Sequence, residues 1–88
     1  MEQLQEIIVW DISAQRIHLM ERNLKNAMRK LEMQARVQFN SEEPLLSRFR
    51  LLGKTPVVQI NGGGMWSCVP GEAVSEEAFV QLLQRYRR

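Results

Sequence analysis

Residues that commonly carry chemistry are few in this sequence, because cysteine and histidine each occur once, as Cys68 and His18. A single thiol cannot form an internal disulfide, and one cysteine with one histidine supplies too few ligands for a zinc site. The spacing around His18 implies no nucleophile or carboxylate partner for it. The sequence therefore predicts no catalytic residues, no metal site and no cofactor.

A second group of polar residues lies where the pattern predicts the start of a long helix. Asp11 and Ser13 are candidate N-caps, and Arg16 and His18 follow them. The free N–H groups and positive dipole end of such a helix, with these cations nearby, are suited to holding an anion. The alternative is that Ser13 is a simple cap and that Arg16 and His18 face solvent.

Cys68 lies on a predicted strand that also contains Met65 and Trp66. Two interpretations of the thiol stay open: a small buried apolar side chain, or an exposed thiol that forms an intermolecular disulfide or responds to oxidants. Trp66 is either part of the core or an anchor for a dimer or another partner at the edge of the sheet.

Length and composition indicate one globular domain over residues 1–88. Apolar residues make up 44% of the chain and charged residues 25%, which are ordinary values for a folded domain. The longest apolar run, Ile7–Trp10, is far shorter than the roughly 20 residues that cross a bilayer. Residues 1–6 have neither the basic nor the apolar part of a secretory signal, so we expect a cytoplasmic protein with no membrane partner.

The net charge of +2 permits contact with nucleic acid but does not require it. Acidic residues are nearly as numerous as basic ones, and the interleaved aromatic residues of single-strand binders are missing. A solvated face is therefore the favoured interpretation of the basic side chains, which are Arg48, Arg50, Lys54, Arg85, Arg87 and Arg88.

The hydrophobic pattern predicts seven elements in the order β-α-β-α-β-β-α. Apolar residues at steps of three and four mark the helices, and short β-branched or alternating runs mark the strands. Asn61-Gly62 predicts a hairpin between the last two strands. These elements predict an α/β fold with a mixed four-stranded sheet and helices on both faces. The expected strands are 7–10, 36–40, 57–60 and 65–69, and the expected helices are 13–31, 41–52 and 75–86.

The segment Thr55-Pro56-Val57-Val58-Gln59-Ile60-Asn61-Gly62 resembles a strand of small thioredoxin-like redox proteins. This resemblance implies a cis peptide bond before Pro56, which faces the active site in that family. The family's Cys-x-x-Cys would correspond to Ser13-Ala14-Gln15-Arg16 here, where there is no cysteine. Because exchange needs a thiolate, dithiol chemistry is excluded. The resemblance leaves a candidate binding groove formed by Ser13, Arg16, Thr55 and Pro56.

Three functions follow as hypotheses. The preferred one is a non-catalytic thioredoxin-like module that binds a protein or peptide, either another protein or a second copy of itself. The second is a thiol- or glutathione-related protein that uses Cys68 or the groove between Ser13 and Pro56. The third is a nucleic-acid-associated adaptor that uses the basic surface.

Overall fold

The computed structural model describes residues 5–48, 50–51, 53–62, 65–67 and 70–85. The order of its elements is the one that the sequence predicts. None of the helices in this part of the chain is both long and apolar enough to span a membrane. The elements are β1 (Gln5–Trp10), α1 (Ala14–Lys30), β2 (Ala35–Asn40), α2 (Glu43–Arg48), β3 (Val57–Ile60), β4 (Met65–Ser67) and α3 (Glu76–Gln84).

The long helix α1 has defined signals at both ends. Ser13 is its N-cap, and the Ser13 hydroxyl oxygen accepts a hydrogen bond from the Arg16 backbone N–H at 3.3 Å. At the other end, Glu32 has a φ of 52°, and the Met33 N–H donates to the Met28 carbonyl at 2.9 Å. This is a Schellman ending in which Glu32 occupies the left-handed position that usually holds glycine.

The strands pair in the order β2-β1-β3-β4, with β1 parallel to β2 and antiparallel to β3. The prediction of a mixed four-stranded sheet with helices on both faces is wrong. Three strands, β2, β1 and β3, form the sheet that carries the core. The returning segment β4 is a three-residue strand that, within the described part of the chain, pairs with β3 alone.

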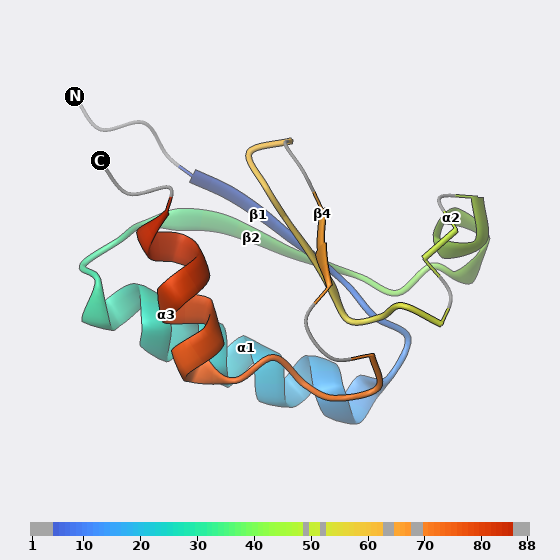
Figure 1. Cartoon of the computed structure of the whole chain (residues 1–88), viewed down its shortest axis with the longest axis horizontal. Helices are drawn as coiled ribbons and strands as arrows, with labels where there is room; N and C mark the ends of the chain where they lie inside the picture. Colours follow the sequence, from blue (N-terminus) through green and yellow to red (C-terminus); the bar gives the residue numbers. More distant parts are fainter. Residues whose placement is uncertain (1–4, 49, 52, 63–64, 68–69, 86–88) are drawn as a thin grey trace.

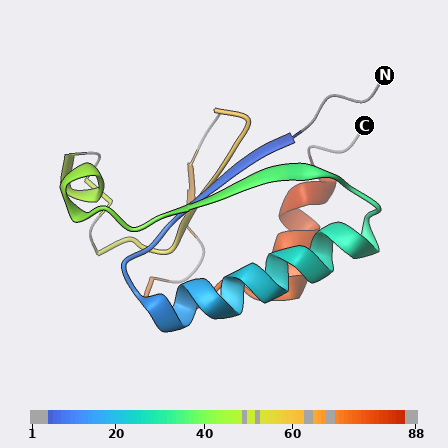
Figure 2. The same ribbon diagram turned by 180° about the vertical axis from the view of Figure 1, so that it is seen from behind.

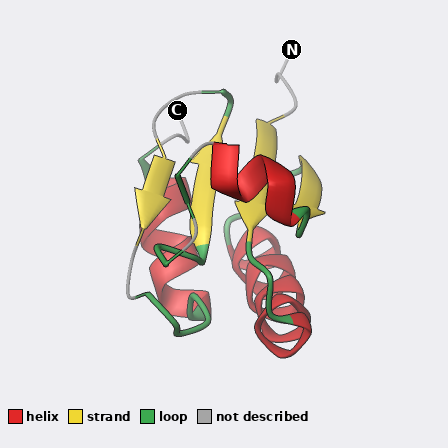
Figure 3. Cartoon of the chain, turned by 90° about the vertical axis from the view of Figure 1, so that its right-hand side faces the viewer, coloured by secondary structure: helices red, strands yellow, loops and turns green. Residues whose placement is uncertain are grey.

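The helices are also distributed less evenly than predicted. Both α1 and α3 lie on one side of the sheet, whereas α2 lies at the end of the strands (Figures 1 and 3). With six residues, α2 is only about 9 Å long and cannot cover a sheet face. The sheet face opposite α1 and α3 is therefore largely uncovered, and it needs no cover because most of its side chains are polar. Glu6, Arg36 and Gln38 are exposed there, and Ile8 and Gln59 are half-buried.

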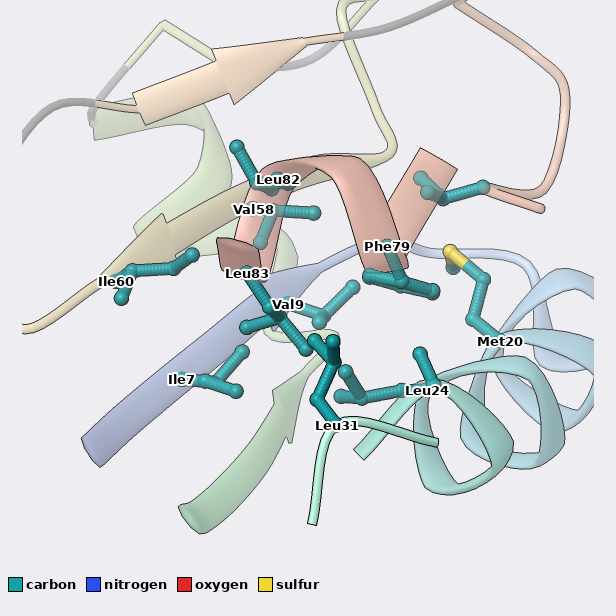
Figure 4. Close-up of a cluster of buried hydrophobic side chains, with 12 residues drawn as sticks. Ile7, Val9, Met20, Leu24, Leu31, Val58, Ile60, Phe79, Leu82 and Leu83 are labelled. Carbon is teal, nitrogen blue, oxygen red and sulfur yellow. The ribbon is translucent and has the colours of Figure 1, made fainter. Parts of the chain in front are cut away.

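The main core lies between the sheet and the helix pair α1 and α3. Figure 4 shows Phe79 and Leu83 of α3 directed toward Leu24 of α1, with Ile7 and Val9 of the sheet beside them. All five side chains are at most 1% exposed. Burial of apolar area on this scale is the main force that holds the two helices on the sheet.

A second, smaller core explains the position of α2. Leu46 of α2 is fully buried and packs with Trp10, Leu51 and Val57 at the ends of β1 and β3. The predicted continuation of this helix to residue 52 is wrong, because α2 ends at Arg48 and Arg50 has a φ of 58°. Left-handed backbone at that position is incompatible with a continuing α-helix.

The hairpin at Asn61-Gly62 is confirmed. Asn61 and Gly62 have φ values of 55° and 70°, which is the left-handed conformation that the Asn-Gly pair favours. Asn61 also ties the turn to β1: its N–H donates to the Glu6 carbonyl at 2.7 Å, and its side-chain oxygen accepts from the Glu6 N–H at 2.8 Å. The turn therefore fixes the register between β1 and β3.

Candidate binding site at the start of helix α1

The centre of the candidate site is a buried carboxylate. Asp11 follows β1 directly and is 0% exposed. Its Oδ1 atom accepts hydrogen bonds from the backbone N–H groups of Ile12 at 2.7 Å and Ser13 at 3.2 Å. A buried carboxylate is costly unless it is hydrogen-bonded and paired, so its remaining partner determines whether this arrangement is stable.

That partner is Arg16, which lies in the first turn of α1. The Arg16 Nε donates to Asp11 Oδ2 and the Arg16 Nη2 donates to Asp11 Oδ1, both at 2.7 Å. Two parallel bonds of this kind are the strongest arrangement of a guanidinium and a carboxylate. Burial raises the pKa of Asp11, but the hydrogen bonds from Arg16, Ser13 and Ile12 outweigh it and leave the pKa below its ordinary value.

Arg16 also connects this pair to the loop that contains the predicted Thr-Pro motif. The third nitrogen of its guanidinium, Nη1, donates to the Gly71 carbonyl at 3.3 Å, and the Gly71 N–H donates to the Thr55 carbonyl at 2.9 Å. The Thr55–Pro56 bond is cis, so that prediction is confirmed. Segments more than 50 residues apart in the sequence, from β1 to the loop before α3, therefore meet at Arg16.

The four predicted site residues differ in how accessible they are. Ser13 is half-buried and the Arg16 side chain is 25% exposed, whereas Thr55 is 5% exposed and Pro56 is less than 2% exposed. Thr55 and Pro56 therefore offer little surface to a ligand. The accessible apolar surface nearby belongs to Ile12, which is 46% exposed.

Three backbone N–H groups around the start of α1 already donate to side chains of the chain itself. The N–H groups of Ile12 and Ser13 donate to Asp11, and the N–H of Arg16 donates to the Ser13 hydroxyl. His18, the other residue considered for such a site, is exposed on α1. The geometry thus favours the interpretation of Ser13 as a cap.

The sequence pattern predicted Asp11 only as a possible N-cap and gave no prediction of its pairing with Arg16. The available signal was a charged residue directly after a buried strand, with an opposite charge five positions later in the first turn of a helix. Arginine is unfavourable in that turn, where the helix dipole is positive. A carboxylate nearby removes that penalty. The predictions for Cys68 and for the side chains of Met65 and Trp66 lie outside the described residues.

The Asp11–Arg16 pair, the cap at Ser13 and the exposed Ile12 thus define the candidate site. No protein-family model matches this chain, and no curated protein matches it.

Proposed function

We propose that this chain is a non-catalytic thioredoxin-like module that binds a protein or peptide at the start of α1. The observation that carries the proposal is the exposure of two large apolar side chains there. Ile12 is 46% exposed and Leu19 is 43% exposed, and they are the exposed large hydrophobic residues of the described part of the chain. Apolar side chains that remain in water lose this unfavourable exposure when a partner covers them.

The backbone beneath this surface is held in place before any partner arrives. The Ile12 N–H is bonded to Asp11, and Asp11 is held by Arg16, which is itself part of α1. Leu19 lies in the second turn of the same helix. A contact surface that is already ordered loses less conformational entropy on binding, so more of the interaction energy appears as affinity.

The polar groups of the site support binding rather than catalysis. A serine nucleophile needs a base within hydrogen-bonding distance that can take its proton. The Ser13 hydroxyl accepts a bond from the Arg16 N–H, and the Asp11 carboxylate is occupied by Arg16 and two backbone groups. Both side chains therefore have structural partners that account for their positions.

Peptide display against the immobilised protein tests this proposal. Selected peptides are measured by fluorescence anisotropy on the wild-type protein and on the variants Ile12→Glu and Leu19→Glu. The control Gln81→Glu introduces the same charge at an exposed position of α3. We expect each apolar-site variant to weaken binding at least about tenfold, because a charge is poorly tolerated in an apolar contact. The control should bind normally. Peptides that bind both apolar-site variants as tightly as the wild type would refute the proposed surface.

A further inference from the structure

The strand β2 forms one edge of the sheet, and its backbone shows which residues face that edge. The Asn40 carbonyl accepts a hydrogen bond from the Asp11 N–H at 3.1 Å, so Asn40 directs its backbone groups toward the β1 side. Backbone directions alternate along a strand. Asn40, Gln38 and Arg36 therefore face β1, and Ala35, Val37 and Phe39 direct their N–H and C=O groups to the other side. Among the described residues, no strand lies on that side of β2.

A groove runs beside the same edge. In Figure 2, β2 lies nearest the viewer and α1 runs below it. The groove between them has a volume of about 390 Å³ and an opening to solvent. It is lined by Glu21, Leu24, Lys25, Met28, Val37 and Phe39. The edge therefore combines outward backbone groups with half-buried apolar side chains, a combination that favours pairing with another strand.

We propose that β2 pairs with β2 of a second copy of this chain, antiparallel and about a two-fold axis that passes beside Val37. In this register Val37 lies opposite Val37 of the second copy, and Ala35 lies opposite its Phe39. Ala35, Val37 and Phe39 are the residues whose backbone groups face outward. In each of the three pairs that they form, each residue therefore donates its N–H to the carbonyl of the residue opposite it and accepts one bond in return. The result is one continuous sheet across the dimer.

Side-chain sizes and charges are self-complementary in this register. On the side of α1, the small Ala35 faces the large Phe39 of the second copy. On the other side, Arg36 faces Gln38, so like charges do not meet. A two-fold axis at Arg36 would place two arginines opposite each other. An axis at Gln38 would leave Ala35 without a partner inside the strand.

The second copy also accounts for the groove. A two-fold axis perpendicular to the sheet places the two α1 helices on the same side of the joined sheet and antiparallel to each other. Glu21 and Lys25, which carry opposite charges one turn apart, line the groove between α1 and β2. An antiparallel copy presents the same two charges in reversed order, so each copy's acidic residue can approach the other's basic one. This surface is separate from that of Ile12 and Leu19, and the inference does not rest on the proposed binding there.

Sedimentation velocity over a wide range of protein concentration measures the oligomeric state. We expect the wild type to be a dimer. Val37→Lys and Val37→Glu should each be monomeric, since the axis brings the two introduced like charges together. An equal mixture of the two variants should form dimers again. The control Gln81→Lys, on the exposed surface of α3, should remain dimeric.

Hydrogen exchange of the wild-type protein gives a second measurement that needs no variant. The amides of Ala35, Val37 and Phe39 should exchange at least about tenfold more slowly at high protein concentration than at low concentration, because pairing protects them. The amides of Arg36 and Gln38 should be protected at both concentrations.

Four results would overturn the inference. They are a monomeric wild type at the highest concentration, a Val37→Lys variant that stays dimeric, a mixture of the variants that stays monomeric, and fast exchange at Val37 at all concentrations. A monomeric wild type would instead indicate that an extended segment of a different protein pairs with the edge of β2.

Discussion

Replacement of Asp11 by asparagine should destabilise the domain by about 2–3 kcal/mol. Asparagine keeps one side-chain oxygen for the N–H groups of Ile12 and Ser13, but its amide group would face the donors of Arg16. The variant thus loses two charge-assisted hydrogen bonds, each of which contributes about 1.5–3 kcal/mol. We reduce their sum because Arg16 is 25% exposed and solvent screens part of the interaction.

A double-mutant cycle measures how much of this loss belongs to the pair. Arg16→Met removes the charge and keeps an apolar stem, and it should also destabilise the domain, because it leaves a buried carboxylate with its backbone partners alone. The double variant Asp11→Asn/Arg16→Met should lose about 2 kcal/mol less than the sum of the two single losses. Arg22→Met, the same replacement at an exposed position of α1, should cost less than about 0.5 kcal/mol.

Urea denaturation followed by circular dichroism gives the free energy of unfolding of each variant. A domain of 88 residues typically has about 4–13 kcal/mol of stability, so the variants should remain folded in buffer. A loss below about 0.5 kcal/mol for Asp11→Asn would contradict the reasoning, since surface replacements have effects of that size. An interaction energy near zero in the cycle would show that the two residues do not stabilise each other.

Three further predictions concern stability. The pKa of Asp11 is lower in the folded state than in the unfolded state, so folding is stabilised above the ordinary aspartate pKa of about 4. The free energy of unfolding should therefore fall as the pH drops below about 4, and urea titrations at pH 7 and pH 3 should show a smaller decline in Asp11→Asn than in the wild type. Glu32→Gly should stabilise the domain by about 0.5–1 kcal/mol in the same assay, because glycine adopts the observed φ of 52° without strain; an unchanged or lower stability would contradict this. Leu24→Ala should lower the free energy of unfolding by about 2–5 kcal/mol, because the Leu24 side chain is only 1% exposed. Leu19→Ala on the same helix, at 43% exposure, should lower it by less than about 1 kcal/mol. Equal losses would show that the core is misplaced.

The features that the sequence predicted correctly are those with local signals. Ser13 begins α1 and Asn61-Gly62 forms the hairpin, because a capping hydroxyl and a left-handed Asn-Gly pair act within a few residues of themselves. The order of the elements follows from the same local patterns. The cis bond before Pro56 was expected from the resemblance to thioredoxin-like proteins. Membership of that family itself stays a prediction.

The features that the sequence did not predict depend on contacts between distant segments. The position of α2 depends on the packing of Leu46 against Trp10 and Val57, and no residue near Arg48 marks the end of the helix. The uncovered sheet face follows from the short α2 together with polar residues contributed by three different strands. A pattern along one segment cannot reveal either, because each is decided by which side chains meet after folding.

The Asp11–Arg16 pair also bears on the kind of partner that we propose for this end of the molecule. A free arginine at a helix N-terminus would add to the positive dipole end and favour an anionic ligand. Here the carboxylate of Asp11 neutralises the guanidinium and occupies the N–H groups of Ile12 and Ser13. The interactions that stabilise the turn therefore also offset the charge that Arg16 would otherwise add to this end of the helix. The binding that we propose at this position therefore rests on the exposed apolar area of Ile12 and Leu19, because burial of such area favours a partner with an apolar surface of its own.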